Sequence, residues 1–103
     1  MTILEWTEPA IIDLKNIREY IASDSAEYAA AVIDRLITSV ERLKSFPESG
    51  RLVPEAPNTR VREILVSGYR IIYRLRKGRA QVLAVMHSAR DMTGMRPKPW
   101  HAA

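Results

Sequence analysis

Residues 61–87 read VREILVSGYRIIYRLRKGRAQVLAVMH, three runs rich in β-branched and aromatic residues with a glycine turn between neighbours. The turns are Ser67-Gly68 and Lys77-Gly78, and connections this short make neighbouring strands antiparallel. The sequence therefore predicts a three-stranded meander with strands over residues 61–66, 69–76 and 79–87.

The middle run separates its side chains into two faces by strand periodicity. One face is aromatic and aliphatic and is the expected core side, comprising Tyr69, Ile71, Tyr73 and Leu75. The other face carries three guanidiniums and one isoleucine, namely Arg70, Ile72, Arg74 and Arg76. A planar guanidinium grips phosphate or carboxylate at two points, so we interpret this face as an open anion-binding surface. The alternative is a solvated face that keeps the chain soluble.

Three expectations depend on the same alternation. In the preceding strand we expect Glu63 to point away from Arg70. Because the basic face is expected to be open, Arg70→Ala and Arg74→Ala are predicted to leave the fold intact. In the following strand one face is expected to hold Val82, Ala84 and Met86.

A strand and two helices are predicted before the sheet. Residues 3–6 form a short apolar run, and Thr7-Glu8-Pro9 is typical of a helix start, with a cap before a proline in the first turn. Apolar residues at helical spacing then predict one helix that fades at residues 22–24 and a second that stops before Pro47. A cap at residues 23–25 separates them, and a connection this short folds two helices into an antiparallel hairpin.

The predicted architecture is α+β: an N-terminal strand and a two-helix antiparallel hairpin packed on one face of an antiparallel sheet. Residues 47–60 contain three prolines and predict an ordered connector rather than a helix or long strand. We expect one domain over residues 1–92 and an irregular C-terminal tail over residues 93–103. In that tail, Trp100 is expected to be part of a loose end or a docking tip.

Composition excludes several classes of function. The 103 residues include no cysteine, which excludes a disulfide scaffold and thiolate chemistry and favours the cytoplasm. No apolar run approaches the roughly 20 residues of a membrane span, and the N-terminus lacks the basic and apolar regions of a secretory signal. The chain has neither a glycine-rich phosphate loop nor a cluster of metal ligands, so we expect no cofactor and no metal.

The charge is unevenly distributed along the chain. Residues 1–50 hold five Lys and Arg against nine Asp and Glu, a net −4, whereas residues 51–103 hold eleven against three, a net +8. The basic half favours a partner of negative charge, either nucleic acid or an acidic protein segment. His87 is interpreted as a structural or surface residue, the alternative being a general acid or base beside a phosphate held by arginines.

Several short motifs, in their order along residues 3–92, resemble the RelE/ParE toxin superfamily. They are Pro47-x-x-Gly50-Arg51, Arg62-Glu63-Ile64, Gly68-Tyr69-Arg70-Ile71-Ile72-Tyr73, and Val85-Met86-His87 followed by Arg90. The resemblance implies a helix hairpin on an antiparallel sheet. It also implies the toxin half of a type II toxin–antitoxin pair, with a cognate antitoxin as partner.

The superfamily divides by target: RelE-like members cleave mRNA in the ribosomal A site, and ParE-like members poison DNA gyrase. A resemblance to RelE-like members implies a site with lysines on the strand before the Gly-Tyr-Arg turn, an arginine in that turn and often a tyrosine near the C-terminus. This chain has Val61 and Glu63 in that strand and no tyrosine after Tyr73, although Arg70 matches the turn arginine. The resemblance therefore favours a gyrase inhibitor. The alternatives are a ribosome-dependent mRNA endonuclease and a non-toxic antitoxin-binding module.

Three groups of residues follow from these interpretations. For a target, whether gyrase or the ribosome with its mRNA, the expected contacts are Arg62, Arg70, Arg74, Arg76 and Arg90. A gyrase inhibitor is assigned no catalytic residue, whereas a ribonuclease would use Arg62, Arg70, His87 and Arg90. For the antitoxin, the resemblance implies an amphipathic helix laid beside the helix hairpin and a strand or extended segment laid on the sheet. The floor of the helix site is expected to include Leu14, Tyr20, Ile21 and Leu36.

Overall fold

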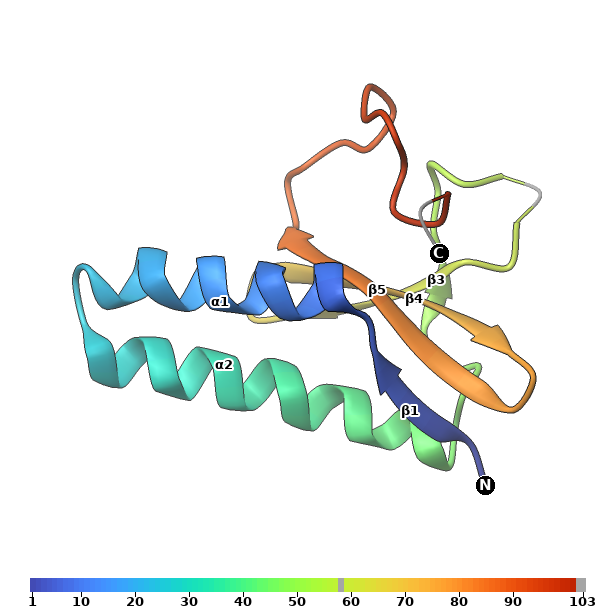
Figure 1. The fold of residues 1–103 in the computed structure, drawn as a ribbon, viewed down its shortest axis with the longest axis horizontal. Coiled ribbons are helices and arrows are strands. Elements are labelled where there is room, and N and C mark those ends of the chain that lie inside the picture. The colour runs from blue at the N-terminus through green and yellow to red at the C-terminus, as the bar shows by residue number, and fades with distance from the viewer. Residues whose placement is uncertain (58, 102–103) are drawn as a thin grey trace.

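The computed structural model describes residues 1–57 and 59–101. Two helices, α1 (Glu8–Ala22) and α2 (Ala26–Glu41), form a hairpin against a sheet, and a 3-10 turn, η1 (Arg42–Lys44), extends α2 (Figure 1). The strands are β1 (Ile3–Trp6), β2 (Arg51–Leu52), β3 (Arg62–Val66), β4 (Tyr69–Arg76) and β5 (Arg79–His87). The α+β prediction is confirmed, and no helix in the described part of the chain is long and apolar enough to cross a bilayer.

The sheet has the strand order β1-β5-β4-β3-β2. Its β3, β4 and β5 form the predicted antiparallel meander. In contrast, β1 pairs with β5 in parallel, so the sheet is mixed rather than wholly antiparallel. Parallel neighbours need a long crossover between them, and the helix hairpin is part of that crossover.

The two helices begin in different ways. Ser25 caps α2, because its hydroxyl accepts a hydrogen bond from the Tyr28 backbone nitrogen at 3.1 Å. Thr7 precedes Pro9 at the start of α1, but its hydroxyl donates to the Val82 carbonyl at 2.7 Å instead of capping the helix. Thr7 therefore joins the start of α1 to β5.

The first hydrophobic core lies between the helix hairpin and the sheet. Ile71 and Tyr73 are fully buried in it, and Tyr69 and Leu75 pack against it, which confirms the predicted core face of β4. The helices contribute the apolar stripes predicted from their spacing, including Ala10, Val32, Leu36 and Val40.

The opposite face of the sheet is not open, which corrects the sequence prediction. The connector between η1 and β3 and the tail after β5 fold over it and enclose a second core. Figure 1 shows these two irregular segments (yellow-green and red) on the same side of the sheet. Strand periodicity shows which residues share a face, but not that irregular segments cover the face. The second core contains Val53, Ala56, Val61, Ile72, Ala84, Met86 and Met92.

A register shift in β5 changes which side chains share a face. Ile72 pairs with Ala84 and Tyr73 pairs with Val82, so Leu83 is an extra residue in β5. Val82 therefore belongs to the first core, and Ala84 and Met86 belong to the second. The expectation that these three side chains share one face is wrong.

The described part of the predicted tail, residues 93–101, contains no helix or strand. It is nevertheless attached to the domain: Met92 is fully buried, and Met95 and Trp100 pack against the second core. Residues 102 and 103 of the predicted tail lie outside the described residues, as does residue 58 of the connector. Trp100 is therefore a packing residue rather than part of a loose end.

Candidate functional site

Arg70 is enclosed by two carboxylates, with only 5% of its side chain exposed. Its Nε donates to Glu63 Oε1 at 2.6 Å. Its two terminal nitrogens each donate to one oxygen of Glu55 at 2.7 Å, and Nη1 also donates to the Arg90 carbonyl at 2.7 Å. Arg70 is therefore not the exposed target contact that the sequence predicted, because its planar fork is already held by carboxylates within the chain.

Glu63 is the second buried member of this network, with none of its side chain exposed. Its Oε2 accepts from Arg51 Nε at 2.6 Å while its Oε1 accepts from Arg70. The expectation that Glu63 points away from Arg70 is wrong. The β3–β4 register pairs Glu63 with Ile72, which lies on the Arg70 face of β4.

Glu55 ties the connector and the tail to this network. The Arg70 guanidinium is the main cause that lowers the pKa of Glu55 to about 2, and the Met92 backbone nitrogen donates to Glu55 Oε2 at 3.2 Å. The hydrogen bonds that Arg70 donates to Glu55 are also the main cause that raises the pKa of Arg70. The charged pair therefore closes both irregular segments over the second core.

Arg62 and His87 lie on the other face of the sheet from Arg70. Arg62 pairs with Tyr73 across the β3–β4 register, and its Nη1 donates to the carbonyls of Gly50 at 2.7 Å and Glu48 at 3.1 Å. His87 pairs with Tyr69, the first residue of β4, and their rings lie edge to face with centroids 6.0 Å apart.

The residues proposed for a ribonuclease are therefore not brought to one place. Arg62 and His87 share a face but lie on different strands on either side of β4, opposite Tyr73 and Tyr69, whereas Arg70 lies on the other face. The Nδ1 of the exposed His87 accepts from the Ala89 backbone nitrogen at 3.1 Å. Arg90 is exposed, and the structure places its carbonyl, not its guanidinium, against Arg70.

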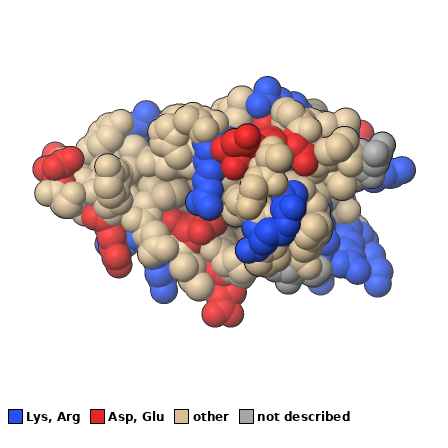
Figure 2. All heavy atoms as spheres, turned by 90° about the horizontal axis from the view of Figure 1, so that it is seen from above, with Lys and Arg blue, Asp and Glu red and all other residues tan. Residues whose placement is uncertain are grey.

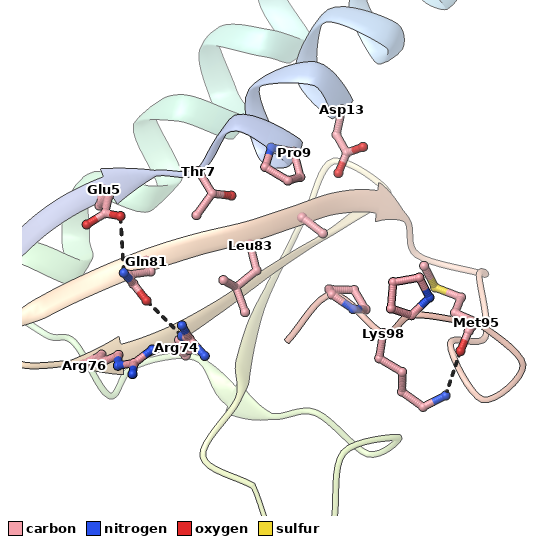
Figure 3. Close-up of a pocket in the computed structure, with 13 residues that line it drawn as sticks. Glu5, Thr7, Pro9, Asp13, Arg74, Arg76, Gln81, Leu83, Met95 and Lys98 are labelled. Atoms are coloured by element: carbon pink, nitrogen blue, oxygen red, sulfur yellow. Dashed lines mark hydrogen bonds between the residues drawn. The ribbon is translucent and has the colours of Figure 1, made fainter. Parts of the chain in front are cut away.

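Arg74 and Arg76 lie on the Arg70 face of β4, beside a cleft of about 510 Å³ (Figure 3). Arg74 Nε donates to Gln81 Oε1 at 2.9 Å, and Gln81 Nε2 donates to Glu5 Oε2 at 3.2 Å. The cleft is bounded by the start of α1 and by the tail, where Lys98 lines it and folds its ammonium back onto carbonyls of the tail. Of the predicted target contacts, Arg74 and Arg76 both line this cleft.

Asp13 is a residue of this cleft that sequence reasoning did not single out. Pairing of β5 with β1 stops at Val82, and Asp13 Oδ2 then accepts from the Val85 backbone nitrogen at 2.9 Å. Burial raises the pKa of Asp13, although the Val85 hydrogen bond and the charge of Arg90 act in the opposite direction. The available signal was only that its carboxylate lies off the apolar stripe of the first predicted helix.

The residues predicted for antitoxin binding are spread over different depths. Leu36 is fully buried between the helices and the sheet and cannot form part of a surface groove, because it lies at the centre of the α2 stripe. Leu14 and Ile21 are partly buried against the first core. Tyr20 is 80% exposed.

Within the described residues, no group of three or more His, Cys, Asp or Glu side chains could hold a metal ion. The acidic side chains around Arg70 are instead paired with arginines.

The fold and the arrangement of motifs define a toxin of the RelE/ParE type, and comparison with known proteins identifies the branch. Residues 4–92 match the family described as the ParE toxin of the type II toxin–antitoxin system parDE. The chain therefore belongs to the ParE toxin family.

Two relatives of known sequence are similar over most of their length. Toxin RelE2 of Caulobacter vibrioides is 34% identical over 90 residues, which cover 87% of this chain and 99% of that protein. The putative toxin Y4kP of Sinorhizobium fredii is 34% identical over 85 residues, covering 82% of this chain and 86% of that protein.

Solved structures share the fold. A chain of the chromosomal ParDE toxin–antitoxin system of P. aeruginosa superposes with a TM-score of 0.72 at 22% identity, covering 84% of this chain and 96% of that one. A chain of the RelBE2 toxin–antitoxin complex of Mycobacterium tuberculosis superposes with a TM-score of 0.55 at 18% identity, with the same coverage.

Proposed function

We propose that this ParE-family toxin inhibits DNA gyrase in the cytoplasm and is neutralised by a cognate antitoxin. The observation that carries the proposal is the match to the ParE toxin family over residues 4–92. The resemblance to ParE-like members of the superfamily implies DNA gyrase as the target. The fold comparison supports the same branch, because the TM-score is 0.72 with the ParDE chain and 0.55 with the RelBE2 chain.

The geometry of the candidate ribonuclease residues also supports a target other than mRNA. Cleavage of RNA needs a proton acceptor, a proton donor and cations around one phosphate. In this chain Arg70 is sequestered by Glu55 and Glu63, and His87 lies on the opposite face of the sheet. An inhibitor that acts by contact needs no such constellation.

An antitoxin partner is supported by exposed apolar side chains on the helix hairpin. Ile11 and Ile12 of α1 are 41% and 48% exposed, and Tyr20 and Tyr28, on either side of the loop between the helices, are 80% and 58% exposed. An amphipathic helix of a partner would bury such residues along its apolar face. These positions replace the buried Leu36 in the proposed antitoxin surface.

A second candidate is a ribosome-dependent mRNA endonuclease. The observation that favours it is the similarity to toxin RelE2, at 34% identity over 99% of that protein.

Expression of the chain without an antitoxin separates the two candidates. Gyrase poisoning is expected to produce broken plasmid DNA and a DNA-damage response while mRNA stays intact. Truncated mRNA cut in register with codons, with intact DNA, would instead support the endonuclease. Normal growth with both nucleic acids intact would contradict both and leave a non-toxic antitoxin-binding module.

A further inference from the structure

The turn between β4 and β5 concentrates positive charge at one end of the molecule. Arg76 and Arg79 are direct partners in the β4–β5 register, so their side chains leave the same face of the hairpin. Lys77 and Gly78 connect them with φ angles of 52° and 75°, the left-handed pair typical of a two-residue hairpin turn. Lys and Arg atoms gather at the right-hand end of the molecule in Figure 2, which is the end where this hairpin turns in Figure 1.

This concentration of charge opposes the stability of the hairpin. Like charges directly across two strands repel each other and destabilise the pairing. The carboxylate nearest to Arg79 is that of Glu5, at 3.7 Å, and the two side chains are 49% and 40% exposed. An ion pair with this separation and this exposure contributes little to the stability of the fold. Neither the strand pairing nor this ion pair accounts for the cluster of cations at the tip.

The cleft beside the hairpin continues the same cationic surface. Arg74 and Arg76 form one side of it, and Leu83 lies between them and the tail (Figure 3). Lys98 lines the side formed by the tail, where its Nζ donates to the carbonyls of Met92, Thr93 and Met95 at 2.9–3.2 Å. The carboxylates of Glu5 and Asp13 lie toward α1, so an anion is favoured on the β4 side of the cleft.

We propose that the tip of the β4–β5 hairpin, formed by Arg76, Lys77 and Arg79, binds the phosphate backbone of duplex DNA, with Arg74 continuing the contact along the cleft. The inference rests on the proposed function in one respect: DNA is the polyanion present where gyrase acts. Duplex DNA carries one negative charge about every 1.7 Å of its axis, so several cations at one tip contact several phosphates at once. Arginine forks suit phosphate oxygens because they bind in two places.

The test is the binding of the purified chain to a fluorescent DNA duplex, measured by anisotropy over a series of salt concentrations without gyrase. The hairpin variant is Arg76→Gln/Lys77→Asn/Arg79→Gln, in which asparagine tolerates the left-handed backbone of residue 77. The matched control is Lys15→Gln/Arg18→Gln/Arg35→Gln, which removes the same charge from exposed positions of α1 and α2. Circular dichroism of both variants checks that the fold is retained.

The hairpin variant is expected to lose about tenfold or more in affinity. Its plot of log affinity against log salt should become shallower by about 3, because each lost phosphate contact removes about one unit of slope. The control should keep the wild-type slope and stay within about threefold of the wild-type affinity.

Equal losses in the hairpin variant and the control would overturn the inference, because net charge alone would then explain binding. Tighter hairpin-dependent binding to single-stranded RNA or to polyglutamate would overturn the assignment to DNA. Gyrase inhibition without duplex binding would refute the inference and leave the proposed function intact. Duplex binding through the hairpin without gyrase inhibition would support the inference and refute the proposed function.

Discussion

At the scale of single residues, Arg70 has a different role from the one its position in the sequence predicts. Alternation along β4 correctly separates it from Tyr69 and Ile71, but gives no information about what covers its face. Its partner Glu55 lies 15 residues away in the chain, in a connector without periodicity. No spacing rule could pair these two residues, so the buried ion pair could not be predicted from sequence.

The first prediction concerns the loss of this arginine. Arg70→Ala is expected to lower the free energy of unfolding by about 3–5 kcal/mol, because it removes the cation shared by Glu55 and Glu63 and leaves the buried Glu63 with Arg51 as its remaining cation. Arg76→Ala, at an exposed position of the same strand, is the control and should change stability by less than about 0.5 kcal/mol. Urea unfolding monitored by circular dichroism measures both. Coincident curves for the two variants would show that the Glu55–Arg70–Glu63 network does not stabilise the fold.

The second prediction concerns pH. The folded chain holds the pKa of Glu55 at about 2, below its usual 4.5. A depressed carboxyl pKa stabilises the fold above the unfolded pKa, and this stabilisation is lost as the pH falls from about 4.5 to about 2. Glu55→Gln should therefore destabilise the chain at pH 7 and flatten the acid limb of its stability profile. Glu41→Gln, at an exposed position of α2, should retain that limb. Parallel profiles for Glu55→Gln and wild type would contradict the assignment.

At the scale of elements, hydrogen bonds from outside the strand ladder attach two segments to the sheet: the chain around Gly50 to β4, and α1 to β5. Gly50 sits where the chain passes Tyr73, whose hydroxyl accepts from the Gly50 nitrogen at 2.9 Å and donates to the Pro47 carbonyl at 2.8 Å. At the other edge, Asp13 replaces β1 as the partner of β5. The Pro47-x-x-Gly50-Arg51 motif thus has a structural reason, which the motif alone did not reveal.

The third prediction tests the passage at Gly50. A Cβ at this position would lie 2.6 Å from Tyr73 Cε1 and 2.7 Å from the Glu63 carbonyl oxygen. Gly50→Ala should therefore cost about 1–3 kcal/mol or more of stability by overpacking. Gly94→Ala is the control, since a Cβ there would meet nothing within 4 Å. Thermal melts that coincide for both variants would show that the backbone at residue 50 yields freely.

The fourth prediction tests the role of Asp13 at the edge of β5. Burial raises the pKa of Asp13, so its stabilising contribution is present at low pH and is lost as the pH rises through the folded pKa. Asp13→Asn keeps an acceptor for the Val85 nitrogen without the charge and should be as stable as wild type, or more stable, at pH 7. Asp13→Ala leaves that nitrogen without its acceptor and should cost about 1–3 kcal/mol. Equal unfolding midpoints for the Asn and Ala variants would refute this role.

At the scale of the whole molecule, the sequence predicted the elements and the first core because both depend on local periodicity. Residue spacing alone predicts the helix hairpin, the meander and the side chains of β4 that face the first core. The second core does not, since the extra residue Leu83 reverses the alternation of β5 and residues without periodicity cover the sheet. The target contacts divide in the same way: Arg74 and Arg76 remain on an accessible surface, whereas Arg70 is buried by segments whose course is set by tertiary packing.

Inhibition of DNA gyrase is the central property proposed for this toxin. The measurement is a cleavage assay with purified DNA gyrase and plasmid, run beside purified ribosomes programmed with mRNA, with the wild-type chain added to both. We predict linearised plasmid that accumulates only when gyrase is present, intact mRNA, and the same pattern for His87→Ala. Unbroken plasmid together with mRNA cut in codon register by wild type, and not by His87→Ala, would contradict the account and identify the chain as a ribonuclease.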